Sequence, residues 1–118
     1  MKPRSAKNKG KRLENRIGQD IADLLGVKFG PRRSVRRAFP GERGTDIVIM
    51  PPYREEFPFS VECKNQERWN VPQYIDQARY NKLPDTHWLV VMCKNHAEPV
   101  VVMDWQVFLD LYRAPNTK

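Results

Sequence analysis

The stretch at residues 45–64, TDIVIMPPYREEFPFSVECK, decides the fold because it contains two apolar runs separated by a short link. Residues 45–50 are rich in β-branched side chains and end at a Pro-Pro pair, which predicts a buried strand. Residues 57–64 predict a second strand. The short link between them favours antiparallel pairing, because parallel strands need a long crossover connection.

Ionisable side chains interrupt both predicted strands. Glu62 and Lys64 share one face of the second strand, because strand side chains alternate between faces. If the pair is centred near Arg54, Asp46 stands opposite Glu62, and opposed carboxylates repel each other. A divalent cation held by carboxylate oxygens would offset this repulsion, with the ammonium of Lys64 beside it. The alternative is a structural ion pair between Lys64 and one of the two acids.

The rest of the chain is divided by apolar spacing and by Gly, Pro and Asn signals. The predicted elements are a helix over residues 10–25, an irregular strand and loop over 27–39, a helix over 70–83, strands over 87–93 and 99–103, and a helix from 104. This order predicts one α/β domain over residues 10–118, with a mixed sheet flanked by helices. Residues 1–9 are predicted to form a flexible basic arm.

The first predicted helix carries an acid within its apolar face. At about 100° per residue, Glu14 falls inside the apolar arc that runs from Leu13 through Ile17 and Ile21 to Leu25. A carboxylate turned toward a core costs several kcal/mol unless it is paired, protonated or bound to a metal. The alternative is that Glu14 lies at the edge of the arc, in solvent.

The last predicted helix carries several aromatic side chains on one face. These are Trp105, Phe108 and Tyr112, together with Leu109. The face could serve a dimer or belong to the ordinary core, and the spacing does not separate these readings.

Charge is unevenly distributed along the 118 residues, whose net charge is +7. Residues 1–43 hold 13 Lys and Arg against 4 Asp and Glu, a net of +9, whereas the remainder holds 8 against 10, a net of −2. Such a basic region favours a polyanionic partner, nucleic acid first. Its alternative interpretation is a solvated tail and loop that promote solubility.

Several classes of protein are excluded or disfavoured. No apolar run approaches the ~20 residues of a membrane span, and the basic N-terminus has no apolar stretch behind it. Two cysteines are too few for a disulfide framework and suit a reducing compartment, so we expect an intracellular protein without membrane partners. Neither a phosphate-binding glycine loop nor zinc-ligand spacing is present, and we expect no small-molecule cofactor.

The sequence resembles the PD-(D/E)XK nuclease superfamily at these acidic positions. Asp46 and the triplet Glu62-Cys63-Lys64 match its core motif, with Thr45 in place of the usual Pro. More narrowly, Lys9-Gly10-Lys11-Arg12-Leu13-Glu14 matches the helix that opens archaeal-type Holliday junction resolvases, which some viruses and phages also encode. The resemblance covers residues 9–83 and implies a restriction-endonuclease-like core.

The resemblance also implies a function and roles for particular residues. We expect a Mg²⁺-dependent DNA endonuclease, able to use Mn²⁺, that resolves four-way junctions as a homodimer by paired symmetric cuts. Its expected site comprises metal ligands Asp46, Glu62, the main-chain carbonyl of Cys63 and Glu14, with Lys64 stabilising the transition state and Gln77 in support. DNA contacts are expected from Lys9, Lys11, Arg12, Arg32, Arg33, Arg36 and Arg37. The alternatives are a nuclease for nicked, flapped or duplex DNA and a basic DNA-binding module without catalysis.

Overall fold

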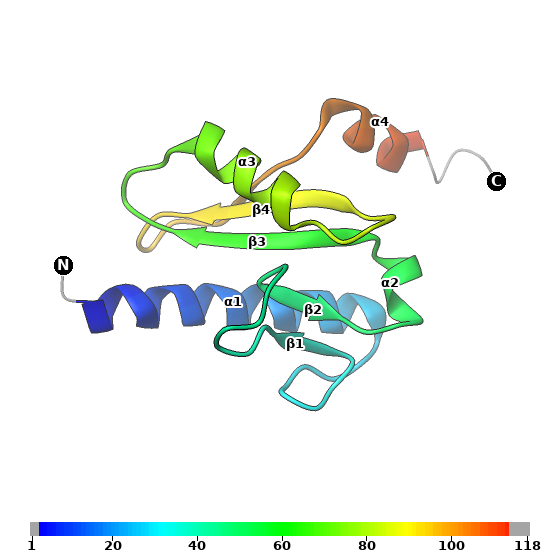
Figure 1. Cartoon of the computed structure of the whole chain (residues 1–118), viewed down its shortest axis with the longest axis horizontal. Helices are drawn as coiled ribbons and strands as arrows, with labels where there is room; N and C mark the ends of the chain where they lie inside the picture. The colour runs from blue at the N-terminus through cyan, green and yellow to red at the C-terminus, as the bar shows by residue number, and fades with distance from the viewer. Residues whose placement is uncertain (1–2, 114–118) are drawn as a thin grey trace.

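The computed structural model describes residues 3–113, which form a five-stranded mixed sheet with helices on both faces (Figure 1). The strands are β1 (Val35–Arg37), β2 (Ile47–Ile49), β3 (Phe59–Asn65), β4 (His87–Cys93) and β5 (Val100–Val102), and they lie in that order. Only β3 and β4 are parallel; the other neighbours are antiparallel. This is the predicted single α/β domain, with the architecture of a restriction-endonuclease-like core.

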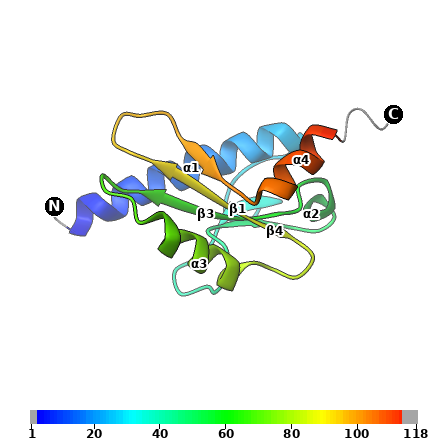
Figure 2. The ribbon, with the colours of Figure 1, turned by 90° about the horizontal axis from the view of Figure 1, so that it is seen from above.

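Helices cover the two faces of the sheet, as the view in Figure 2 shows. The helices are α1 (Pro3–Leu25), α2 (Tyr53–Glu56), α3 (Val71–Asn81) and α4 (Trp105–Arg113). Helix α1 packs against β1 and β3, whereas α3 connects β3 to β4 and packs on the opposite face. The parallel β3–β4 pair therefore has the helical crossover that parallel strands require.

The two faces have separate apolar clusters. The cluster beneath α1 includes Ile21, Ala22, Val35, Ile47, Ile49, Phe59, Val61, Leu89, Val91 and Val107. The cluster beneath α3 includes Tyr74, Ala78, Trp88, Val90 and Met92. Alternate residues of β4 enter opposite clusters, so this strand is buried on both faces, as expected for a strand with helices above and below it.

The paired strands in the deciding stretch have the predicted register. Ile47 of β2 pairs with Val61 of β3, which centres the pair on Arg54. The link is longer than a tight turn, because it contains α2. Strand β2 is also shorter than the predicted residues 45–50, so that the C-terminal half of β3 continues past the start of β2 (Figure 1).

Helix α1 begins earlier than predicted. It starts at Pro3 rather than at residue 10, so residues 3–9 are helical and not the flexible arm that we expected; residues 1–2 lie outside the described residues. Apolar spacing could not reveal this N-terminal part of α1, because residues 3–9 are charged, polar or small and have no periodic apolar residues. The predicted end is confirmed: Gly26 follows α1 with φ 71°, a left-handed conformation that favours glycine.

The other predicted elements are confirmed with small changes in their bounds. Asn70 caps α3 by accepting a hydrogen bond from the Gln73 N–H at 3.3 Å, and α3 ends at Asn81, two residues before the predicted end. Within residues 3–113, none of the helices has the length and apolar character needed to cross a membrane.

Candidate active site

Asp46 lies immediately before β2, at the point where β2 separates from β3. Its backbone N–H still donates to the Val61 carbonyl at 2.9 Å, which is the last rung between the two strands. Further along β3, the Asp46 carboxylate is the acceptor in place of the backbone, because its Oδ2 accepts the Cys63 N–H at 2.7 Å. The Asp46 carboxylate thus accepts a β3 hydrogen bond that a backbone carbonyl of a longer β2 would accept. This bond holds the Asp46 side chain against β3.

Glu62 is brought beside Asp46, as the register predicted. Its side chain is buried, with the residue only 4% exposed. Burial first, and then the negative charge of Asp46, raise the pKa of Glu62 to about 8. A hydrogen bond with Asp46 acts in the same direction, whereas the hydrogen bond from Asn81 and the charge of Lys64 lower the pKa.

No cation of the described chain forms an ion pair with these two carboxylates. Lys64 shares the Glu62 face, but its ammonium lies over the Tyr74 ring, 5.3 Å from the centroid. Tyr74 is in turn held by a hydrogen bond from its hydroxyl to Gln66. The alternative of a structural ion pair between Lys64 and one acid is therefore not found in the described part of the chain.

Asn81, rather than the predicted Gln77, contacts the acidic pair. Its Nδ2 donates to Glu62 Oε1 at 3.0 Å from the last turn of α3. Gln77 is exposed one turn earlier. A signal for Asn81 was present, because Tyr74, Ala78 and Asn81 follow i, i+4, i+7 spacing on the buried face of α3.

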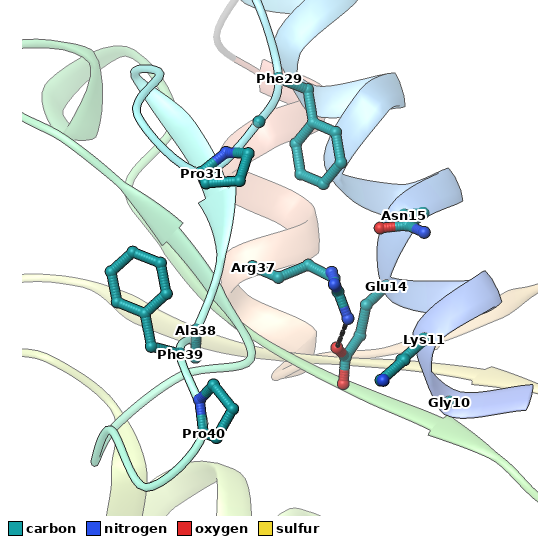
Figure 3. A pocket seen from close by; sticks show the side chains of 11 residues that line it. Gly10, Lys11, Glu14, Asn15, Phe29, Pro31, Arg37, Ala38, Phe39 and Pro40 are labelled. Atoms are coloured by element: carbon teal, nitrogen blue, oxygen red, sulfur yellow. Dashed lines mark ion pairs between the residues drawn. The ribbon is translucent and has the colours of Figure 1, made fainter. Parts of the chain in front are cut away.

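Glu14 approaches the pair from α1. Its side chain is half-buried, and its pKa is raised by burial and then by the charge of Asp46, against the charges of Arg37 and Lys11. Oε1 lies 3.8 Å from a guanidinium nitrogen of Arg37 (Figure 3). Across residues 3–113, no three His, Cys, Asp or Glu side chains are close enough together to hold one ion, so Glu14 stands apart from the Asp46–Glu62 pair.

The cysteine between the acid and the lysine has a separate environment. The side chain of Cys63 packs against the cluster beneath α1, as its position in the strand predicted. Burial, followed by the charges of Asp46, Glu14 and Glu62, raises the pKa of its thiol, which is therefore not a nucleophile at neutral pH. The expected metal contact is from its main-chain carbonyl, not from sulfur.

The predicted DNA-binding cations fall into two groups. Lys11, Arg12, Arg32 and Arg33 are exposed, as a phosphate-binding surface requires. Lys9, Arg36 and Arg37 have other contacts within the chain. Lys9 is only 8% exposed, and its carbonyl accepts a hydrogen bond from Asn65 at 3.1 Å.

Arg36 is part of a closed structural pair. Its guanidinium binds both carboxylate oxygens of Glu42, at 2.8 and 3.0 Å, and lies 4.2 Å above the centre of the Phe39 ring. The hydrogen bond from Arg36 and another from the Phe39 N–H lower the pKa of Glu42 to about 2. Arg36 thus holds the loop that follows β1.

Comparison with protein families gives a match over most of the chain. Residues 5–117 match the family model described as "Phage putative PDDEXK endonuclease". Neither the curated proteins nor the solved structures gave a match. The family match covers nearly the whole chain.

Proposed function

The chain belongs to a family of phage PDDEXK endonucleases and is a nuclease, and we propose that it cuts four-way DNA junctions with Mg²⁺ as a homodimer. The observation that supports the metal is the Asp46–Glu62 pair. These are neighbouring carboxylates, one of them buried, and no described cation pairs with them. A divalent cation from solution would neutralise the negative charge of these two carboxylates.

The donor atoms at this site fit Mg²⁺. Magnesium in proteins is held by oxygen, commonly by one or two carboxylates together with waters and substrate phosphate oxygens. Asp46 and Glu62 supply those two carboxylates, and the Cys63 carbonyl is the third protein ligand that we propose. Glu14 would extend the site from α1 rather than bind the same ion directly. Mn²⁺ would substitute, because it accepts the same hard oxygen donors.

The chain's own residues provide the remaining functions. The Cys63 N–H orients the Asp46 carboxylate, and the Asn81 amide orients that of Glu62. Lys64 has a flexible side chain whose ammonium rests over Tyr74, from where it can turn to the scissile phosphate and stabilise the charge that develops there. When bound, Mg²⁺ would lower the pKa of a water and neutralise phosphate charge.

An exposed aromatic surface on α4 supports the dimer. Trp105 and Tyr112 are 70% and 73% exposed, and Phe108 between them is 47% exposed. The rings of Trp105 and Phe108 stack with centroids 5.7 Å apart. This surface is not part of the core, which was the alternative interpretation of its spacing. We propose that it meets the same surface of a second copy, since an isologous dimer matches the two-fold symmetry of a four-way junction.

The proposal is tested by cleavage of a labelled four-way junction, a matched duplex and single strands, with Mg²⁺ and with EDTA. We expect paired symmetric nicks in the junction with Mg²⁺ and none with EDTA. Asp46→Asn and Glu62→Gln should abolish cleavage while leaving binding intact or tighter. The exposed acids Asp76 and Glu55 provide the matched controls Asp76→Asn and Glu55→Gln.

The outcomes separate the alternatives. Retained cleavage in both site variants would contradict the assignment of Asp46 and Glu62. Equal cutting of duplex and junction would contradict the junction as the preferred substrate and indicate duplex DNA. Faster cutting of nicked or flapped DNA would indicate those structures as the substrate. A monomeric protein whose Trp105→Ala variant still makes paired cuts would contradict the dimer.

A further inference from the structure

Two neighbouring side chains of β3 bind the segment in which α3 ends. Glu62 Oε1 accepts a hydrogen bond from the Asn81 amide at 3.0 Å. Two residues earlier on the same face of β3, Ser60 Oγ accepts the Leu83 N–H at 2.9 Å. The two hydrogen bonds therefore join the same two segments, and each end of the Glu62–Asn81 contact is only two residues from the Ser60–Leu83 contact.

The contact between Ser60 and Leu83 belongs to a closed network of buried hydrogen bonds. Ser60 Oγ lies 2.7 Å from Thr86 Oγ1, and Thr86 Oγ1 donates to the Leu83 carbonyl at 2.7 Å. A hydroxyl has one proton, so Ser60 is the donor in its bond with Thr86. In this hydroxyl network the Leu83 N–H donates to Ser60, Ser60 donates to Thr86, and Thr86 donates back to the Leu83 carbonyl. Ser60 and Thr86 are only 2% and 6% exposed, so water has little access to these bonds.

The hydroxyl network fixes a part of the chain that the helix itself does not fix. Helix α3 ends at Asn81, and Lys82 is already extended, with φ −64° and ψ 144°. The final carbonyls of a helix have no partner within the helix, so its last turn is held only by other contacts. Tyr74 and Ala78 anchor the middle of α3 in the apolar cluster beneath it. The network at Leu83 anchors the end of α3, and with it the backbone that carries Asn81.

Packing of the sheet does not require hydroxyls at these positions. Ser60 pairs in register with Trp88 of β4, and Trp88 and Val90 belong to the apolar cluster on this face. An apolar pair of similar shape in place of two hydrogen-bonded groups is often nearly neutral for stability. Hydroxyls differ from an apolar pair because their hydrogen bonds are directional, and here they set the position of residues 81–83 along β3.

We propose that Ser60 and Thr86 are positioning residues for Glu62 and act through Asn81. The hydroxyl network holds the end of α3 where the Asn81 amide meets Glu62, and the amide then fixes the direction of the Glu62 carboxylate. This inference rests on the proposed function, because it takes Glu62 to be a ligand of a divalent cation. It adds to the site two residues that do not contact the cation and whose loss weakens its binding.

Binding of Mn²⁺ to the whole chain without DNA tests this role independently of cleavage. Electron paramagnetic resonance measures the free Mn²⁺ in a titration. Asn81→Ala should weaken binding about tenfold, the usual size of effect for a residue that orients a metal ligand. Ser60→Ala should weaken it to a similar extent, because Asn81 is then no longer held at Glu62. The double variant should bind no more weakly than Asn81→Ala alone, since effects that act through one shared contact are not additive.

A matched pair of substitutions at Thr86 separates the hydroxyl from the shape of the side chain. Thr86→Val keeps the shape and removes the hydroxyl, so it should weaken Mn²⁺ binding. Thr86→Ser keeps the hydroxyl and should bind as wild type does. Val107→Ala is the control for general destabilisation, because Val107 is buried in the other apolar cluster, on α4. It should lower the melting temperature and leave Mn²⁺ binding unchanged.

A second measurement needs no metal. In EDTA, the side-chain amide protons of Asn81 are identified in nitrogen-15 spectra by their absence from Asn81→Ala. They should exchange slowly with water in wild type, because Glu62 accepts a hydrogen bond from this amide. Ser60→Ala and Thr86→Val should speed the exchange, and Thr86→Ser should not.

The outcomes distinguish this inference from the proposed metal site. Unchanged Mn²⁺ binding in both Ser60→Ala and Thr86→Val would overturn the positioning role, and so would additive losses in the double variant. Equal losses in Thr86→Val and Thr86→Ser would also overturn it, because the shape of the side chain would then matter rather than the hydroxyl. Mn²⁺ binding that is unchanged in Glu62→Gln would overturn the metal site itself, and the amide exchange would still show whether the hydroxyl network holds Asn81.

Discussion

Glu42 and Glu62 are the same amino acid placed in opposite electrostatic surroundings. Glu42 lies in the loop after β1, where Arg36 and the Phe39 N–H bind it and its pKa falls to about 2. Glu62 lies in the middle of the sheet beside Asp46, where the neutral amide of Asn81 donates to it, and its pKa rises to about 8. The chain compensates the first carboxylate itself. The second has no ion-pair partner within residues 3–113, which is the property expected of the metal ligand that we propose rather than of a structural acid.

The largest expected effect is that Glu62→Gln and Glu42→Gln change cleavage and thermal stability in opposite ways. Glu62→Gln should lower the cleavage rate by on the order of 10³-fold, because one of the two carboxylates that we propose as metal ligands is lost. The same variant should melt at a higher temperature than wild type in EDTA at pH 9, because a buried charge is removed. Glu42→Gln should show the reverse: near-normal cleavage and a slightly lower melting temperature. Loss of cleavage in Glu42→Gln, with retention in Glu62→Gln, would invert the comparison.

The next effect is the pH dependence of stability, measured by thermal or urea unfolding in EDTA. The pKa of Glu62 is higher in the folded chain than its ordinary 4.5, so folding takes up a proton and the free energy of unfolding falls as pH rises from about 4.5 to about 8. The contribution of Glu62 to this change in the free energy of unfolding is on the order of 2–4 kcal/mol. It is measured as the difference between the pH curves of wild type and Glu62→Gln.

Two controls sharpen this titration. Mg²⁺ should restore wild-type stability above pH 8, where the carboxylates are charged, and should have little effect on Glu62→Gln. Glu42 has the opposite sign: its contribution is present above pH 4.5 and is lost as pH falls through about 2, so Glu42→Gln should differ from wild type mainly above that range. A wild-type curve that matches Glu62→Gln throughout would remove the electrostatic argument for the metal.

A smaller effect is expected from Asn81, the amide that donates to Glu62. Asn81→Ala should reduce activity about 10-fold and raise the Mg²⁺ concentration needed for half-maximal cleavage, since outer residues that orient metal ligands have effects of roughly that size. Gln77→Ala, on the same helix and exposed, should remain within about twofold of wild type. If Gln77→Ala shows the larger defect, the predicted residue supports catalysis and the observed contact does not.

The difference between Asn81 and Gln77 also shows what the sequence could and could not predict. The opposition of Asp46 and Glu62 followed from the strict alternation of strand side chains and from where the two apolar runs end. The rotation of α3 over the sheet depends on how Tyr74 and Ala78 pack, and this decides which polar residue reaches Glu62. A search for amides on that buried face would have found Asn81.

Other features were beyond prediction for different physical reasons. The early start of α1 left no apolar signal, because residues 3–9 have no apolar face to bury. The segments on either side of β1 are irregular, and their course depends on the closed Arg36–Glu42 pair and on the contact of Phe29 with Gly18. A count of charges treated Arg36 and Arg32 alike, although only Arg32 is free of an ion pair within the described residues.

The smallest effect compares these two arginines by the salt dependence of DNA binding. A side chain that neutralises one phosphate adds about 0.9 to the slope of log K against log salt, because it releases condensed counterions. Arg32→Ala should therefore reduce the slope by close to that amount. Arg36→Ala should change it by less than half as much, since the Arg36 guanidinium already neutralises Glu42 and has little net charge to offer a phosphate. Anisotropy titrations of a labelled junction in EDTA at several salt concentrations measure both slopes. An equal fall in both variants would mean that Arg36 leaves Glu42 when DNA binds, and the two carboxylates would then differ less in the complex than they do in the free protein.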